Sequence, residues 1–475
     1  MRQVGRFARF QSEKSGNTLC PFSLHTRLLC CNFAAAMKQK DDGKKKKGVR
    51  ERKPNYKEYR ASVDDIQTFL LGKIMLRHNV ITRRVEYWLP CSEPQPPNAG
   101  GRWGLDDWQP ISDRVVNSLW KELSQTKEVS AADIYRVLDS DFVSDFHPFR
   151  FYLEHLRKWD GESDYILSLS MSVSVRSNSD DQLYFYHCLK KWLVAMVASW
   201  VDPLVVNNVI LVLIGEQGSY KTTWFQYLLP PELRQYFYTK TNANRMSRDD
   251  LITLSEFGLV CCEELDTMRP SELNQLKAAV TMPAVNERAA YAHYAERREH
   301  IASFCGTGNN MQFLSDPTGN RRWLPFEVDH ILSPREIPFE YEGIYAQAYG
   351  LYKQGFQYWF GQDDIQRLSH HNRQFETPSL EAELVQLYFR KPRCSEPGEF
   401  MPVSLAIQIV GVGITQKLST VMLGRAFMEQ GFERKTYRNS RGYVVVRRSA
   451  EEMRSLRSMM AVANENTDTD DTDVF

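Results

Sequence analysis

An apolar run from Val209 to Ile214 leads directly into Gly215–Thr223, whose sequence is GEQGSYKTT. A buried strand, a glycine-bearing turn and a helix that starts with Lys-Thr are together typical of nucleoside triphosphate binding. In that arrangement backbone N–H groups and the helix N-terminus hold phosphate oxygens, the lysine neutralises their charge, and the threonine hydroxyl reaches Mg²⁺. The stretch therefore predicts an α/β fold of the P-loop NTPase type.

The candidate ATP-binding residues span this loop and the start of the helix: Gly215, Gly218, Ser219, Tyr220, Lys221, Thr222 and Thr223. The usual pattern has glycine where this chain has Tyr220. Because that position joins the loop to the helix, we expect Tyr220 to fit without a positive φ angle. We also expect the side chain of Lys221 to be exposed at the loop. The alternative is a glycine-rich turn with an incidental lysine.

A second apolar run, Phe257–Cys262, ends in Glu263-Glu264-Leu265-Asp266. A buried parallel strand delivers such carboxylates to the C-terminal edge of its sheet. In phosphate-binding folds one acid at this edge holds Mg²⁺ and a neighbouring acid activates the attacking water. We therefore predict Glu263 and Glu264 as catalytic acids, and Thr222 with Glu263 as the residues that hold Mg²⁺.

The stretch Ile301–Asn310 predicts a third strand that ends in polar residues, among them Asn309. Many ring-forming ATPases carry an amide at this place to position water. Beyond the next turn come Arg321 and Arg322. Adjacent arginines are usually solvated or bind phosphate, and the alternative is an arginine finger that stabilises charge on a nucleotide held by the next subunit. All three residues are candidate catalytic residues.

The motifs GEQGSYKTT, EELD, GTGNN, FLSD and TGNRRW, in this order, resemble the virulence-associated protein E family of phages and other mobile elements. The resemblance covers Gly215 to about Phe326 and extends upstream through Asn79–Tyr87 and His147–Arg150. It implies a modified AAA+ core, related to superfamily 3 helicases and phage primase-helicases, that works as a ring.

The resemblance also implies roles for single residues. Lys221 and Thr222 match the phosphate and Mg²⁺ residues of the family, and Glu264 matches the acid of its E-L-D segment. Asn309 matches the sensor asparagine, and the arginine pair matches Arg321 and Arg322. Two positions depart from the family: Tyr220 replaces a glycine, and Cys261 stands where many relatives have an acid, which leaves Glu263 as its substitute.

A chain of 475 residues predicts several domains. Residues 1–60 hold 16 Lys or Arg against 5 Asp or Glu, so this leader either contacts nucleic acid or is a solvated, disordered tail. We expect a basic leader at 1–55, a mainly helical domain at 56–200, the ATPase domain at 201–345, a helical connector at 346–375, a winged-helix-like domain at 376–450 and an acidic tail at 451–475. Nine cysteines without metal-site spacing, and no membrane-length apolar run, predict a cytoplasmic protein.

The winged-helix prediction comes from three helical patterns followed by a hairpin pattern. The helices are expected at Glu381–Leu387, Val403–Val410 and Leu418–Glu429, and the hairpin turn at Asn439–Gly442. In such a domain the third helix enters a groove of DNA and the wing contacts phosphates. The candidate DNA-binding residues are Arg425, Arg434, Lys435, Arg438 and Arg441. The alternative is a small α+β domain with an exposed basic hairpin.

Together these patterns predict a helicase-like ATPase that acts on DNA in the replication of a phage or mobile element. ATP and Mg²⁺ are the expected cofactors, and DNA, further copies of the chain in a ring, and a separate primase or other replication proteins are the expected partners. The alternative is a nucleotide-gated DNA-binding or assembly module with weak or no hydrolysis, which Tyr220 and Cys261 favour. A small-molecule kinase fits less well, because the flanking domains resemble nucleic-acid-binding ones.

Overall fold

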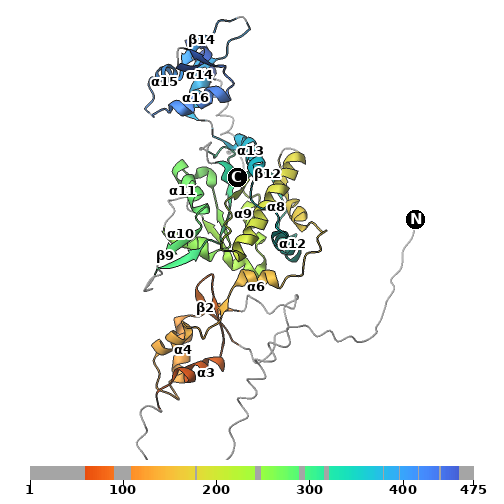
Figure 1. Cartoon of the computed structure of the whole chain (residues 1–475), viewed down its shortest axis with the longest axis vertical. Helices are drawn as coiled ribbons and strands as arrows, with labels where there is room; N and C mark the ends of the chain where they lie inside the picture. Colours follow the sequence, from red (N-terminus) through yellow and green to blue (C-terminus); the bar gives the residue numbers. More distant parts are fainter. Residues whose placement is uncertain are drawn as a thin grey trace, which may run out of the picture. The chain divides into compact units, whose positions relative to one another are not determined.

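The computed structural model describes residues 59–89, 108–176, 179–240, 248–287, 295–314, 320–377, 379–394, 396–415, 417–437 and 440–458. Within these residues the fold is mixed α/β and is built around a largely parallel sheet (Figure 1). The predicted α/β class is therefore confirmed. The predicted basic leader lies outside the described residues, as does most of the acidic tail.

The central sheet has six strands in the order β5-β12-β6-β11-β8-β7. The five strands β12, β6, β11, β8 and β7 are parallel to one another. At one edge of the sheet, β5 pairs antiparallel with β12. The strands are β5 (Val173–Val175), β6 (Ile210–Ile214), β7 (Phe237–Lys240), β8 (Leu259–Cys262), β11 (Ser303–Gly308) and β12 (Trp323–Ile331). All residues of β6 are buried, as its unbroken apolar run predicts for a strand covered on both faces.

Successive side chains of β6 enter two different hydrophobic cores. Leu211 and Leu213 pack with α8 (Ser179–Val201), α9 (Lys221–Leu228) and α12 (Tyr341–Lys353). The alternate residues Ile210, Val212 and Ile214 pack on the other face, which α10 (Arg248–Glu256) and α11 (Pro270–Val280) cover (Figure 1). Because β11 pairs in parallel with both β6 and β8, the segments after these three strands meet at one edge of the sheet, where ligands bind in open α/β folds.

The described part of residues 61–146 contains three helices and four strands. The helices are α3 (Val63–Leu71), α4 (Asp113–Leu123) and α5 (Ala131–Leu138), and the strands are β1 (Met75–Asn79), β2 (Arg84–Trp88), β3 (Gln109–Pro110) and β4 (Asp145–Phe146). The strands make one sheet in the order β3-β2-β1-β4. Strands of two residues have no periodicity of their own, so tertiary pairing alone defines them. The helices α6 (Pro148–Glu154) and α7 (Tyr165–Ser170) follow.

The C-terminal residues have their own hydrophobic core, and the three predicted helices occur in the predicted order. The elements are α14 (Leu380–Tyr388), β13 (Phe389–Arg390), β14 (Glu399–Pro402), α15 (Val403–Val410), α16 (Thr420–Glu429), β15 (Arg434–Tyr437) and β16 (Ser440–Arg447). The hairpin turn is not at Asn439–Gly442, because β16 already begins at Ser440. Gly442 serves packing instead: a Cβ there would lie 2.5 Å from the Met401 carbonyl oxygen of β14.

Two shorter stretches connect these parts. The strands β9 (Ala284–Glu287) and β10 (Glu296–Glu299) pair with each other in antiparallel orientation. In the chain they come after α11 and before β11. After α12 come α13 (Gln362–His371) and the 3-10 helix η5 (Asn372–Phe375). Among the described residues, no helix is both long enough and apolar enough to cross a membrane.

Candidate functional site

The two glycines of the loop after β6 are required for different reasons. Gly215 lies against β12, where a Cβ atom would come 2.8 Å from the carbonyl oxygen of Val328. Its N–H donates to the carbonyl of Gly308 at the end of β11, at 3.2 Å. Gly218 has open space around it but a φ angle of +81°, which glycine adopts most readily. The loop is therefore held close to the sheet at its start and bends at Gly218.

Tyr220 adopts a left-handed backbone conformation. Its φ angle is 62° and its ψ angle 13°, in the left-handed region, directly before α9. The expectation of a fit without positive φ is therefore wrong. The chain needs the left-handed turn here to enter the helix, and a tyrosine in this region costs about 1–2 kcal/mol more than a right-handed residue. The ring gains little packing in return, because Tyr220 is 44% exposed.

Lys221 folds back onto its own loop and is only 7% exposed, so the expectation of an exposed side chain is wrong. Its Nζ donates to the carbonyl oxygens of Gly215 at 2.7 Å and Glu216 at 2.6 Å, and to Ser219 Oγ at 3.2 Å. These acceptors satisfy the ammonium group inside the protein. Burial lowers the pKa of Lys221, and the nearby carboxylates of Asp266 and Glu216 act against that effect.

Thr222 and Glu263, predicted as a pair from two separate motifs, meet directly. The Thr222 Oγ1 hydroxyl at the start of α9 donates to Glu263 Oε1 at 2.9 Å. Glu263 is the first residue after β8, and its backbone N–H donates to the Lys240 carbonyl at the end of β7. Hydroxyl and carboxylate oxygens are the ligands that Mg²⁺ prefers. This contact joins the loop of the first motif to the acidic segment of the second.

Cys261 and Glu264 lie on either side of this pair in different environments. Cys261 is fully buried inside β8, opposite Cys305 of β11, in the core that α8 covers. An acid at position 261 would therefore enter that core rather than the edge. Glu264 is exposed and has a φ angle of 54°, which turns the chain into the 3-10 helix η3 (Leu265–Thr267). Only Glu263 of the two acids contacts Thr222 among the described residues.

Asp266, the last residue of the Glu263–Asp266 segment, is a further candidate site residue that was not predicted. Its Oδ2 accepts the backbone N–H of Asn310 at 3.1 Å. Its Oδ1 is buried, has no hydrogen-bond partner among the described residues, and lies 3.2 Å from where a Cβ on Gly308 would sit. An unpaired buried carboxylate oxygen is costly and marks a candidate ligand position. The sequence shows only that Asp266 belongs to the acidic segment after β8, three residues after Glu263.

Asn309 directly follows β11 and is exposed. Its neighbour Asn310 donates its backbone N–H to Asp266, so the start of this loop is tied to the acidic segment.

In the loop after β6, Ser219 donates through Oγ to the Glu216 carbonyl at 2.8 Å. Thr223, on the first turn of α9, is half-buried. The structure thus brings the three predicted segments to one edge of the sheet.

Arg321 and Arg322 belong to the 3-10 helix η4 (Asn320–Arg322), directly before β12. Arg321 is exposed and Arg322 is half-buried. Within the described ranges, no hydrogen bond or ion pair joins either guanidinium to Lys221 or Glu263. The arginine pair therefore directly precedes β12 of the same sheet but does not belong to the cluster around Thr222.

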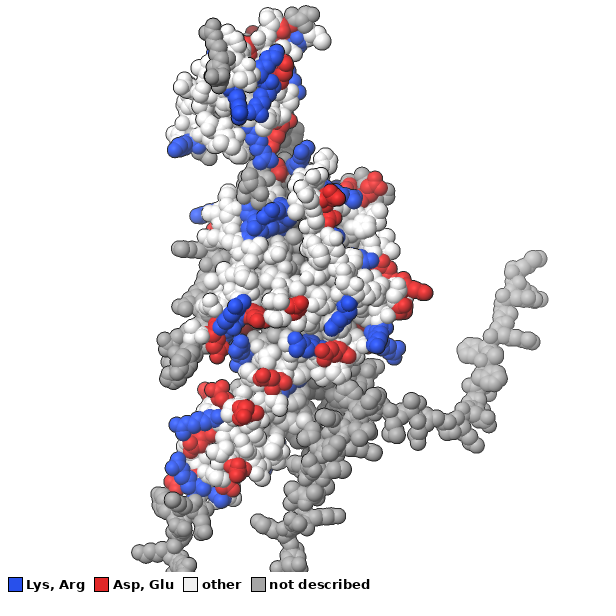
Figure 2. Space-filling view, in the orientation of Figure 1, with Lys and Arg blue, Asp and Glu red and all other residues white. Residues whose placement is uncertain are grey.

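The predicted DNA-binding residues are distributed over α16 and the β15–β16 hairpin. Arg425 is in an ion pair with Glu429 at 2.5 Å, and Lys435 with Glu433 at 3.3 Å. Arg434 and Arg441 are exposed and have no ion pair with another described residue. Arg438 lies outside the described residues. Over the face shown in Figure 2, basic and acidic side chains are interspersed. DNA binding on this face would therefore depend on individual basic side chains rather than on a broad basic surface.

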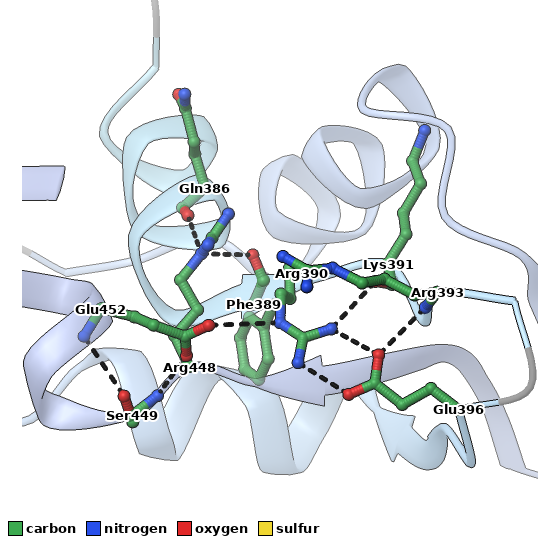
Figure 3. Close-up of polar contacts among 9 residues, drawn as sticks. All are labelled: Gln386, Phe389, Arg390, Lys391, Arg393, Glu396, Arg448, Ser449 and Glu452. Atoms are coloured by element: carbon green, nitrogen blue, oxygen red, sulfur yellow. Dashed lines mark hydrogen bonds and ion pairs between the residues drawn. The ribbon is translucent and has the colours of Figure 1, made fainter.

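Other basic residues of the C-terminal part act within the protein (Figure 3). Arg390 donates to both carboxylate oxygens of Glu396, at 2.6 and 2.7 Å. These hydrogen bonds stabilise the carboxylate and lower the pKa of Glu396 to about 2. Arg448 donates through Nε to the carbonyls of Gln386 and Phe389, at 3.1 and 3.3 Å, at the end of α14. Arg390 and Arg448 are therefore structural rather than additional DNA-binding candidates.

Comparison with known proteins bears on the central part of the chain. Residues 153–377 match the model of the virulence-associated protein E-like domain. This range contains Gly215 to Phe326, on which the sequence resemblance chiefly rests. The upstream segments Asn79–Tyr87 and His147–Arg150 lie outside the match.

Among solved structures, the apo structure of the NrS-1 C terminal region (305–718) aligns with this chain at 12% sequence identity and a TM-score of 0.45. The alignment covers 80% of this chain and 98% of that chain. The A form apo structure of the same region gives 12% and 0.44 with the same coverage. No protein of curated function matches the chain. The part of the chain that carries the site is thus similar to the virulence-associated protein E-like domain.

Proposed function

We propose that this chain is a DNA-acting ATPase whose magnesium-nucleotide site lies at the edge formed by the segments after β6, β8 and β11. The observation that carries the proposal is the contact between Thr222 Oγ1 and Glu263 Oε1 at 2.9 Å. Two residues 41 positions apart, each expected to hold Mg²⁺, meet beside a loop that contains a buried lysine. The strand order supports this, because it places both parent strands in one parallel sheet.

The residues fit a magnesium nucleotide in kind as well as in place. When bound, Mg²⁺ ATP supplies the phosphoanhydride bond that is cleaved. Lys221 would neutralise phosphate charge after leaving its loop carbonyls, while Thr222 and Glu263 would hold the metal. Glu264 would act as the base toward water, and Asn309 would orient that water. Arg321 or Arg322 would stabilise negative charge on a nucleotide in a neighbouring subunit.

The proposal extends to partners and biological setting. The match to the virulence-associated protein E-like domain supports a role in the replication of a phage or mobile element. DNA would be contacted in part by a winged-helix-like C-terminal domain, for which the order of three helices and a hairpin is the support. A homo-oligomeric ring, a separate primase or other replication proteins, and a cytoplasmic location complete the proposal.

A nucleotide-gated DNA-binding or assembly module is the second candidate. The left-handed Tyr220 favours it, because strain at the point where the loop joins α9 hinders the backbone from closing around phosphates. In this version ATP binding orders the chain or its assembly on DNA, and hydrolysis is slow. The two candidates share the binding site and differ in turnover.

The deciding experiment measures ATP affinity by calorimetry and DNA-stimulated phosphate release. Lys221→Met keeps most of the side-chain volume and removes the charge, so ATP binding is expected to be lost while the melting temperature stays within a few degrees. Lys121→Met, at an exposed position on α4, is the matched control and is expected to behave like the parent. Equal ATP affinity in the parent and Lys221→Met would reject the site. Binding without DNA-stimulated turnover in the parent would select the second candidate.

A further inference from the structure

The arginine pair of η4 is held in place by a segment that follows it by about fifty residues. This segment, which we name the strap, consists of η5 with Glu376 and Thr377. It comes directly after α13, whose last residue, His371, is bound through Nε2 to the Pro325 carbonyl of β12 at 2.7 Å. The strap therefore begins at the strand that the arginines precede.

One buried side chain of the strap bonds to the backbone on both sides of the arginines. Asn372 is 0% exposed, and its Nδ2 donates to the carbonyl oxygen of Asn320 at 2.8 Å and to that of Trp323 at 3.1 Å. Arg321 and Arg322 are the two residues between these carbonyls. A single amide group thus fixes both ends of the turn that carries the arginine pair.

A second side chain of the strap supports the same turn. Asn320 is 4% exposed and donates through Nδ2 to Glu376 Oε1 at 2.7 Å. Strap and turn are therefore joined by three hydrogen bonds that use side chains of both segments. The chain before the turn is bonded to the strap as well: Phe313 and Leu314 donate through N–H to the Phe375 carbonyl, and Thr377 donates to the Leu314 carbonyl.

The energetics favour a fixed turn. A buried carbonyl left without a donor is costly, so loss of the Asn372 amide would allow η4 to shift until water or another donor replaced it. Phe375, 1% exposed, anchors the strap in the core beside α11. No hydrogen bond or ion pair joins either guanidinium to another described residue, so the backbone of η4 decides where the two side chains begin. An arginine that stabilises charge in a transition state must be placed before the reaction.

We propose that Asn372 is a positioning residue, which holds the carbonyls of Asn320 and Trp323 so that Arg321 and Arg322 are presented to the nucleotide of a neighbouring subunit. This rests on the proposed ATPase function and on its arginine role. Asn372 does not touch substrate in this scheme. It acts through the backbone of η4, and Glu376 acts with it through Asn320.

The test uses full-length Asn372→Ala, with Asn117→Ala, an exposed amide on α4, as the matched control. We expect Asn372→Ala to keep ATP affinity within about twofold and to lower kcat by about tenfold to a hundredfold, because a displacement of about 1 Å costs on the order of a hundredfold. Mixing it with Lys221→Met subunits should restore activity, since the mixture contains interfaces with a sound loop and a soundly placed arginine pair.

Glu376→Ala and Glu376→Gln form a second pair that also decides the question should Asn372→Ala fail to fold. Glutamine keeps an acceptor for Asn320, so Glu376→Gln is expected to retain more of kcat than Glu376→Ala. The inference is overturned if the arginine variants lose turnover while both Asn372→Ala and Glu376→Ala keep it. It is also overturned if Asn372→Ala and Glu376→Ala lose ATP binding together with turnover and do not recover activity when mixed with Lys221→Met subunits. That result would mean that these residues stabilise the whole domain rather than position the arginines. If the Arg321→Ala and Arg322→Ala variants keep full turnover, the arginine role itself is rejected.

Discussion

At the scale of single residues, two positions that border the site carry left-handed backbone conformations without being glycine. Tyr220 has a φ angle of 62° and Glu264 one of 54°. Such residues cost energy and are concentrated at functional sites, where surrounding structure holds them in place. Tyr220 is the more informative of the two, because the phosphate-loop pattern has glycine at that position.

Replacement of Tyr220 separates the backbone strain from the ring. Tyr220→Gly should raise the free energy of unfolding by up to about 1 kcal/mol, since it removes a left-handed penalty of about 1–2 kcal/mol but increases the entropy of the unfolded chain. It should also tighten ATP binding. Tyr220→Ala keeps the strain and removes the ring, so it should not show either gain. Chemical denaturation and calorimetry check both variants. Equal gains in the two variants would assign the effect to the ring.

The two acids after β8 should differ in what they do. Glu264→Gln is expected to keep ATP binding and stop hydrolysis, because an amide cannot act as a carboxylate base. Glu263→Gln is expected to weaken the dependence of ATP affinity on Mg²⁺, because Glu263 is the acid bound to Thr222. Titrations of ATP with and without Mg²⁺, together with phosphate release, measure the two effects. Loss of turnover in Glu263→Gln alone would move the base by one residue.

The sequence was sufficient to pair Thr222 with Glu263, because Glu263 directly follows the unbroken apolar run of β8 and Thr222 belongs to the loop-and-helix motif after the unbroken run of β6. It was not sufficient for Asp266. The contact of Asp266 with Asn310 depends on the 3-10 turn η3 and on the left-handed Glu264 before it, and neither has a sequence pattern. The conformations of Tyr220 and Lys221 were predicted incorrectly for a related reason: both follow from the path of the loop backbone.

At the scale of elements, β6 and β8 could be predicted from their continuous apolar runs, and β11 was predicted although Ser303 and Thr307 interrupt its run. The short strands β3, β4, β5 and β13 have two or three residues each and exist through pairing with longer neighbours. The hairpin turn at the C-terminal end was misplaced because Gly442, taken as a turn residue, is required where the strand passes Phe400 and Met401. Glycine therefore indicates either a turn or a close contact, and the sequence does not distinguish the two.

The β15–β16 hairpin gives the DNA-binding proposal a sharper form. Thr436 lies opposite Arg441 in the antiparallel register, and alternation along β15 places Arg434 on the same face as Thr436. Arg434 and Arg441 thus share one face, whereas Lys435 points to the other and is paired with Glu433. If this face contacts phosphates, Arg434 and Arg441 should contribute more to binding than the ion-paired Arg425.

The double variant Arg434→Ala with Arg441→Ala should therefore weaken DNA binding. On duplex DNA it should also reduce the slope of log affinity against log salt by about 0.9 for each phosphate that the protein no longer neutralises. Arg425→Ala should have a smaller effect. Arg136→Ala, which removes an exposed arginine on α5, is the control. Fluorescence anisotropy at several salt concentrations measures the slopes. An unchanged slope in the double variant would place the DNA contact elsewhere, with the basic leader as the next candidate.

At the scale of the whole molecule, a single chain assembles one part of the proposed site and leaves another apart. Lys221, Thr222, Glu263 and Asp266 are brought to one edge of the sheet. Arg321 and Arg322 are held on η4 by the strap, with no hydrogen bond or ion pair to that cluster in the described part of the chain. Under the proposed function, a site completed by the arginine pair of another copy would account for both placements, and the assembly would be the unit that turns over ATP.

Subunit mixing tests the shared site. Arg321→Ala and Arg322→Ala should each keep ATP binding, and the one whose side chain reaches the neighbour should lose about 10³-fold or more in turnover. Mixed with Lys221→Met subunits, that variant should recover part of the activity, because some interfaces then pair a sound loop with a sound arginine. Neither variant alone can form such an interface. If no mixture recovers activity, and the parent stays monomeric with ATP and DNA present, the nucleotide is served by a single chain and the arginines act in some other way.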